Sequence, residues 1–234
     1  MSIPSNKRRV KPRRSYDSTR RRAQAAQTRQ DILKTALQLF LERGYAGTTI
    51  SSVAAAAGVA VETIYRGFGS KAALFKGVVE AAIAGGAARA ALPPEQRPAV
   101  RAMIAEADPR RVLELHAATQ PGIHARAGPL YQVLIEAAGA DPQLADVWHQ
   151  LEAQRLSGMR RIAQRLKTLG GLSREMSIDE AGDVLWTVNS LAVYNLLVVQ
   201  RGWSPERYRD WIASTNVRAL LGGGRRHRRT GRGK

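Results

Sequence analysis

Residues 48–68 have the outline of two short helices joined by a tight turn. Ala54 is small enough to let two helices cross closely, Gly58 suits the turn, and Val59 and Ile64 supply apolar positions after it. The second helix of such a pair can project into the major groove of DNA, which admits one helix. The chemistry that these residues suit is therefore recognition of double-stranded DNA.

The second of these helices is poor in groups that read bases. The stretch GVAVETIYRGFGSKAALF, residues 58–75, holds Ala60, Val61 and Gly67 where hydrogen-bond donors and acceptors would be expected. Base-reading proteins more often present polar side chains to the groove. The sequence thus predicts a DNA-binding outline and leaves open how that outline reads bases.

Helical spacing, caps and breakers predict the elements around this motif. Helices are expected at about 28–43, 49–57, 60–68, 70–85, 95–106, 109–119, 128–138, 142–168, 177–202 and 204–220, with a loop at 119–129. No alternating strand pattern competes with them, so the predicted fold class is all-α. The expected organisation is a basic, disordered N-terminal arm at 1–27, a three-helix DNA-binding domain at 28–85, a larger helical domain at 86–221 and a basic tail at 222–234.

Charge is concentrated at the two ends of the chain. The net charge is +18, but residues 1–29 hold ten basic side chains and one acid, and residues 218–234 hold seven basic side chains and none. Cationic segments gain affinity for nucleic acid by releasing its counterions. The tails therefore suit auxiliary phosphate contacts, or they are simply solvated ends.

Several classes of protein are disfavoured by what the sequence lacks. There is no cysteine, and the four histidines show no metal-ligand spacing, so we expect no disulfide, metal site or cofactor. No nucleophile motif is present, and GFGSK lacks the order of a phosphate-binding loop, so an enzyme is not expected. No signal peptide is apparent, and the apolar run 185–199 is interrupted by polar residues and short for a bilayer. A soluble, cytoplasmic chain without a membrane partner is expected.

The expected helix at 177–202 is apolar nearly all round. One side of it can pack on its own domain, so the rest needs another partner. A second copy of the chain is the simplest candidate. We therefore predict a homodimer through the helices at about 178–201 and 205–221.

Residues 28–75 as a whole resemble the DNA-binding domain of the TetR family of transcriptional regulators. The resemblance rests on ordered features: Phe40, Gly44-Tyr45, Thr48-Thr49, Ala54, Ala57-Gly58-Val59, Thr63-Ile64-Tyr65, Phe68, Ser70-Lys71 and Leu74-Phe75. Residues 185–212 resemble the second domain of the family only weakly. The resemblance implies a helix-turn-helix domain joined to a helical ligand-binding and dimerisation domain.

The resemblance also implies DNA contacts at matching positions. The predicted set is Thr49, Ser51, Ala60, Val61, Glu62, Thr63, Tyr65, Arg66 and Lys71. Hydroxyls and the lysine suit phosphates, and the methyl groups of Ala60 and Val61 suit a thymine methyl. Glu62 either accepts from a cytosine amine or favours the helix N-terminus. Gly67 departs from the family, which commonly has a phosphate-contacting side chain there, and Arg66 or the N-terminal arm is the expected substitute.

By resemblance, the expected function is that of a ligand-responsive regulator, a repressor, which binds a palindromic operator as a homodimer and is released or re-set by a small molecule in the C-terminal domain. Candidate side chains for the ligand pocket are His116, Tyr131, Trp148, His149, Arg155, Trp186 and Asn189, although ordinary core or surface roles are open for each. The alternative is a sequence-tolerant architectural DNA-binding protein driven by its basic tails.

Overall fold

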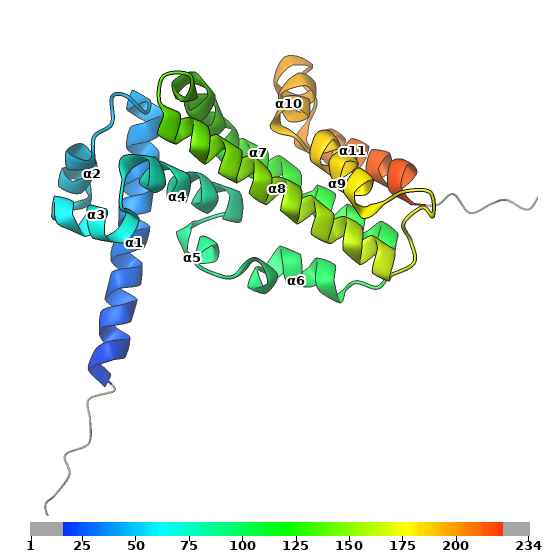
Figure 1. Ribbon diagram of the computed structural model, residues 1–234, viewed down its shortest axis with the longest axis horizontal. Coiled ribbons are helices and arrows are strands. Elements are labelled where there is room, and N and C mark those ends of the chain that lie inside the picture. Colours follow the sequence, from blue (N-terminus) through cyan, green and yellow to red (C-terminus); the bar gives the residue numbers. More distant parts are fainter. Residues whose placement is uncertain (1–15, 222–234) are drawn as a thin grey trace, which may run out of the picture.

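The computed structural model describes residues 16–221 as helices joined by short connections, with no β-strand among those residues (Figure 1). The elements are α1 (Tyr16–Arg43), α2 (Ile50–Ala57), α3 (Val61–Phe68), α4 (Lys71–Ala84), α5 (Ala87–Ala90), the 3-10 turn η1 (Pro94–Gln96), α6 (Pro98–Ala105), α7 (Pro109–Ala138), α8 (Pro142–Thr168), α9 (Ile178–Val188), α10 (Leu191–Tyr194), the π-helical segment η2 (Asn195–Gln200) and α11 (Pro205–Leu220). The predicted all-α class is confirmed. Residues 1–15 and the predicted tail at 222–234 lie outside the described residues.

The turn between α2 and α3 is fixed by local chemistry. Thr49 caps α2 by accepting a hydrogen bond from the backbone N–H of Ser52, whose hydroxyl in turn accepts from the N–H of Thr49. Gly58 ends α2 with φ of +66°, a left-handed conformation that glycine adopts without strain. Its N–H donates to the carbonyls of Ala54 and Ala55. These contacts fix the two ends of α2 and the tight turn to α3 that the sequence predicts.

One hydrophobic core runs through the N-terminal helices and into the larger helical part. Phe40 and Phe75 meet edge to face with ring centroids 4.9 Å apart, and Tyr45 stacks beside them. The same buried cluster continues through Leu130 of α7 and Leu144 of α8. The DNA-binding motif is therefore packed directly on the helices that form the second half of the molecule.

The first helix starts twelve residues earlier than predicted, at Tyr16 instead of Thr28. The prediction followed apolar periodicity, and Ile32 is the first residue of α1 that is buried. The segment before it is rich in alanine and arginine, which have high helix propensity, and most side chains at 19–31 are solvent-exposed. Part of the predicted arm at 1–27 is thus a helix that projects past α3 (Figure 1).

The predicted loop at 119–129 is wrong, because α7 continues through it despite Pro121 and Pro129. A proline removes one backbone donor from a helix interior. Burial of apolar side chains on both sides of the prolines holds the helix together.

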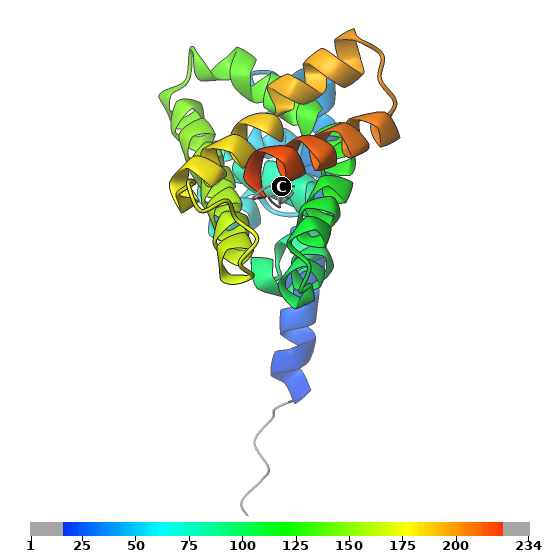
Figure 2. The same ribbon diagram turned by 90° about the vertical axis from the view of Figure 1, so that its right-hand side faces the viewer.

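The single helix predicted for 177–202 is broken after α9. Asn189 is buried, donates to the carbonyl of Leu185 at 2.7 Å and accepts from the amide of Asn216 at 3.4 Å. Ser190 then caps α10, and Figure 2 shows this segment rising away from α9 and α11. A buried polar pair thus redirects the chain.

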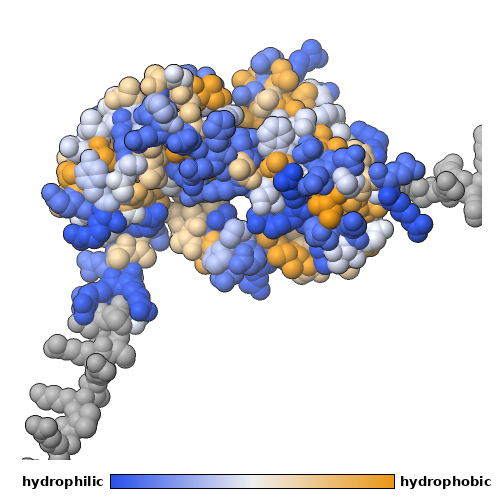
Figure 3. All heavy atoms as spheres, in the orientation of Figure 1, coloured by the Kyte–Doolittle hydropathy of each residue, from blue (hydrophilic) through white to orange (hydrophobic). Residues whose placement is uncertain are grey.

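One stretch of the described residues, Ile178–Gln200, is long and apolar enough to cross a bilayer by length and composition, although little of it is buried. The sequence analysis expected the apolar run 185–199 to be too short for a bilayer. The longer stretch that contains it meets the requirement of length and composition. The break at Asn189 divides the stretch into α9 and the α10–η2 segment. Its exposed apolar side chains gather on the projecting segment labelled α10 (Figures 1 and 3).

Candidate nucleic-acid interface and interior cavity

The exposed face of α3 carries several predicted contacts side by side. Ile64 is fully buried and anchors the helix, whereas Tyr65 is 52% exposed and Glu62 and Arg66 also face solvent. Thr63 is half-buried. The interpretation that Tyr65 is a surface ring rather than a core ring agrees with this exposure.

The N-terminal end of α3 also lies at the surface of the molecule. Ala60 is the N-cap residue of α3 and is exposed, and Val61 is half-buried. No side chain caps this end. The two methyl-bearing residues therefore lie at the end of α3 where predicted, beside backbone N–H groups that lack a capping partner.

Thr49 and Ser51 are exposed at the start of α2. The oxygen of Thr49 accepts a hydrogen bond from the N–H of Ser52 at 3.0 Å. Its hydroxyl proton is still available, since a hydroxyl both accepts and donates. Thr49 can therefore cap α2 and donate to a phosphate at the same time.

Lys71 occupies a position that the sequence did not predict. Its ammonium lies 4.0 Å from the centre of the Tyr45 ring, which is a cation–π contact. Burial lowers the pKa of Lys71, and the nearby carboxylate of Asp141 opposes this effect. The lysine therefore lies over the Tyr45 ring, near Asp141 at the start of α8.

The structure brings Arg29 of α1 to the position that lacks a side chain at Gly67. Its guanidinium donates to the carbonyl of Gly67 at 2.9 Å and lies 4.1 Å from the centre of the Phe68 ring. A β-carbon at Gly67 would meet no atom within 4 Å, so this part of the surface is open. Neither contact was predicted, because the two residues are 38 positions apart and no local pattern links them.

A large cavity lies in the second half of the molecule. Its volume is about 1690 Å³, larger than the ~300–1,000 Å³ of most small-molecule sites. Residues of α4 to α8 and of the α9–α10 junction line it. Of the seven predicted pocket residues, six line it: His116, Tyr131, Trp148, Arg155, Trp186 and Asn189. His149 is exposed and lies outside the cavity, because consecutive helical residues point about 100° apart and Trp148 takes the inward position.

The floor of the cavity is polar and buried. His116 is 4% exposed and His124 is 7% exposed, and the Nε2 atom of each has no hydrogen-bond partner within the described part of the chain. Burial lowers the pKa of both imidazoles to about 4, so both are neutral near neutral pH. His124 and Gln120 were not among the predicted pocket residues.

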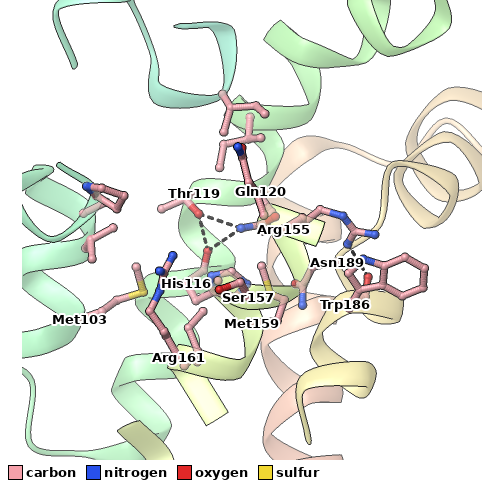
Figure 4. Close-up of a pocket in the computed structure, with 18 of the residues that line it drawn as sticks. Met103, His116, Thr119, Gln120, Arg155, Ser157, Met159, Arg161, Trp186 and Asn189 are labelled. Atoms are coloured by element: carbon pink, nitrogen blue, oxygen red, sulfur yellow. Dashed lines mark hydrogen bonds between the residues drawn. The ribbon is translucent and has the colours of Figure 1, made fainter. Parts of the chain in front are cut away.

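Arg155 holds one wall of the cavity together. It forms an ion pair with Glu152 at 2.7 Å. It also donates to the carbonyl of Trp186 at 2.6 Å and stacks on the Trp186 ring (Figure 4). These contacts tie α8 to the end of α9 beside the bend at Asn189. Among the described residues, no cluster of His, Asp or Glu has the makings of a metal site.

Comparison with known proteins agrees with this architecture. Residues 32–78 match the family model described as "Bacterial regulatory proteins, tetR family". The chain is 25% identical over 210 residues, 86% of its length and 95% of the relative's, to the HTH-type transcriptional repressor BepR of Brucella suis biovar 1.

Solved structures share the fold. One is NalD of Pseudomonas aeruginosa, described as the secondary repressor of the MexAB-OprM multidrug efflux pump, with 22% identity, a TM-score of 0.61 and coverage of 85% of this chain and 98% of that chain. Another is a putative transcriptional regulator of Saccharomonospora viridis in complex with choline, with 19% identity, a TM-score of 0.59 and coverage of 84% and 99%.

Proposed function

This chain belongs to the TetR family of transcriptional regulators, and we propose that it is a ligand-responsive repressor that binds a palindromic operator as a homodimer in the cytoplasm. The observation that carries the proposal is the shared core. The DNA-reading surface of α3 and the large cavity belong to one continuously packed set of helices. Occupancy of the cavity can therefore alter the placement of α3.

Contact with DNA is assigned to the exposed ends of α2 and α3. Ala60 and Val61 face thymine methyl groups in the major groove, and Thr63 and Tyr65 donate to phosphates. Thr49, Ser51, Glu62, Arg66 and Lys71 complete the proposed surface. Methyl contacts give this helix a means of base recognition despite its lack of polar groups at the N-terminal turn.

The dimer interface is assigned to the apolar strip formed by α10, η2 and α11. Leu196 is 53% exposed and Val199 is 67% exposed, whereas Tyr208 and Ile212 are buried beneath the same segment. Exposed apolar side chains concentrated on one segment are typical of an interface. A twofold axis through this strip would give each dimer two copies of α3, which matches the symmetry of a palindromic site.

Helix α4 is the proposed link between cavity and DNA. Ile83 and Ala84 at its C-terminal end line the cavity, and Arg126 of α7 donates to the carbonyl of Ala82 at 2.9 Å. The opposite end of α4 begins at Lys71, directly after α3. A ligand that displaces the C-terminal end would therefore move the reading helices and change their separation.

Selection of bound fragments from a random duplex library tests the proposed function. We expect an inverted repeat with half-sites about one helical turn apart. Recovery of unrelated duplexes without a consensus, with steep salt dependence, would instead support a sequence-tolerant architectural protein whose basic tails dominate binding.

We expect Arg29→Gln to weaken operator binding about tenfold and to lower the slope of log affinity against log salt by about one, as loss of one phosphate contact would. The reason is that the Gly67 carbonyl and the Phe68 ring hold this guanidinium at the edge of α3. Affinity is measured by fluorescence anisotropy at several salt concentrations.

Lys34→Gln is the matched control, because Lys34 is exposed and lies about 140° around α1 from Arg29. Equal losses in the two variants would show that only net charge matters. Two further variants test the replacements that the sequence predicts for the phosphate contact missing at Gly67, namely Arg66 and the N-terminal arm. If Arg66→Gln alone, or deletion of residues 1–22 alone, lowers operator affinity and the salt slope as Arg29→Gln is expected to, that part of the chain supplies the missing contact.

A further inference from the structure

The charges around the cavity are strongly unbalanced. Six arginines line it but only two glutamates, Glu95 and Glu152, and Glu152 is already paired with Arg155 at 2.7 Å. The cavity is otherwise largely apolar, with Val100, Met103 and Ile104 of α6 among its walls. An excess of cationic side chains around a largely apolar space attracts anions more strongly than cations.

Three of these arginines are fixed by backbone carbonyls instead of carboxylates. Arg97 donates to the carbonyls of Leu92 and Ala90, Arg126 to that of Ala82, and Arg165 to that of Glu106. Within residues 16–221, none of the three has a carboxylate within ion-pair distance. A carbonyl orients a guanidinium but does not neutralise it, so the positive charge remains uncompensated.

A fourth arginine reaches into the cavity without any partner. Arg161 of α8 has neither a hydrogen bond nor an ion pair in the described part of the chain, and Figure 4 shows its guanidinium pointing into the space between Met103 and His116. Five donors on one planar group are thus available to a ligand there. Carboxylate, sulfonate and phosphate groups match that geometry.

The buried histidines indicate a second feature of the ligand. His116 and His124 lie on the floor with unpartnered Nε2 atoms, and burying a polar atom without a partner is unfavourable. A neutral imidazole nitrogen forms a hydrogen bond with a hydroxyl without needing an opposite charge. A ligand that carries a hydroxyl on its apolar body would satisfy one of these atoms.

We infer that the effector of this protein is an amphipathic organic anion, with its acidic group at the arginines of the cavity and an apolar body, bearing a neutral polar group, against the floor. The inference rests on the proposed function, since it names the class of molecule for the cavity of that regulator. The inference also predicts that quaternary ammonium compounds bind this cavity weakly, although a structurally similar regulator was solved in complex with choline. Of the two carboxylates that line the cavity, Glu152 is paired with Arg155, so only Glu95 is left to hold a cation, against six arginines.

Compounds with one apolar body and different head groups test the inference. Decanoate, decanol and decyltrimethylammonium are titrated below their micelle concentrations into DNA-free protein, and quenching of Trp148 and Trp186, which line the cavity, reports binding. We expect decanoate to bind about tenfold more tightly than decanol and decyltrimethylammonium to bind least. We expect ω-hydroxydecanoate to bind more tightly than decanoate.

Variants of two neighbouring arginines locate the acidic group. Arg161→Gln should weaken decanoate binding about three- to tenfold and leave decanol binding unchanged. Arg160→Gln makes the same change of charge outside the cavity, because Arg160 pairs with Asp179 at 2.8 Å. This variant should bind decanoate and decanol as the parent does. Equal effects of the two variants, or tighter binding of the cation than of decanoate, would overturn the inference.

Release of operator DNA is measured separately with the same compounds. Release by the cation but not by the anion would contradict the inferred class and leave the proposed function standing. Tight binding of decanoate to the cavity without any effect on DNA would support the anion site and count against the proposed regulatory function.

Discussion

Leu196→Asp is expected to convert the protein from a dimer to a monomer and to weaken operator binding more than about a hundredfold. Leu196 is 53% exposed on η2, within the apolar strip assigned to the interface. An aspartate buried between two copies of the strip would lack a partner, and two opposed carboxylates would repel each other. Without the dimer, each α3 must bind its half-site alone, so the advantage of joint binding is lost.

Sedimentation velocity and operator titration of one preparation measure the two effects together. Ile135→Asp on α7 is the control, since Ile135 is 51% exposed, the same as Leu196 within a few per cent, but lies outside the strip. The control should remain dimeric and bind DNA normally. A Leu196→Asp protein that stays dimeric would show that another surface forms the dimer.

Acid is expected to destabilise the protein through the two buried histidines. Between about pH 7 and pH 5 the pair should lower the free energy of unfolding by about 4 kcal/mol, roughly 2 kcal/mol for each imidazole. Burial lowers the pKa of His116 and His124 from 6.5 to about 4. The neighbouring His124 lowers the pKa of His116 further, and the charge of Arg155 lowers that of His124 further, opposed by a hydrogen bond to the backbone of Asn189. In this range the unfolded chain takes up protons that the folded chain does not, so stability is present above pH 6.5 and is lost as the pH falls toward 4.

Urea unfolding at a fixed protein concentration measures this loss for the parent and for the His116→Gln/His124→Gln variant. The variant has no imidazole at these positions, so its stability should fall by about 4 kcal/mol less over the same pH interval. His149→Gln changes an exposed histidine outside the cavity and should follow the parent. Equal pH dependence in the parent and the double variant would show that other groups cause the acid sensitivity.

Local sequence was sufficient for the DNA-binding motif. Thr49 and Ser70 cap helices, and Gly58 ends one, through contacts within a few residues, so these boundaries could be read directly. The all-α class followed from the same periodicity. The predicted contact residues on α2 and α3 lie on exposed or half-exposed surface because the buried positions between them, such as Ile64, were also recognisable.

The longer elements show where local rules fail. Apolar periodicity placed the start of α1 too late, because an exposed helix of high propensity has no buried side. Pro121 and Pro129 indicated a loop, yet packing on both sides keeps α7 helical. The break at Asn189 depends on Asn216, a residue of another helix.

By itself, the sequence determined the helix-turn-helix and the helical class, since caps, periodicity and residue type act over one or two turns. Tertiary structure alone decided that Arg29 meets Gly67, that Lys71 turns toward Tyr45, and that unneutralised arginines face a pair of neutral histidines. These features join residues far apart in the chain, and their energies depend on burial and on which charge lies opposite which. Neither quantity exists until the helices have packed.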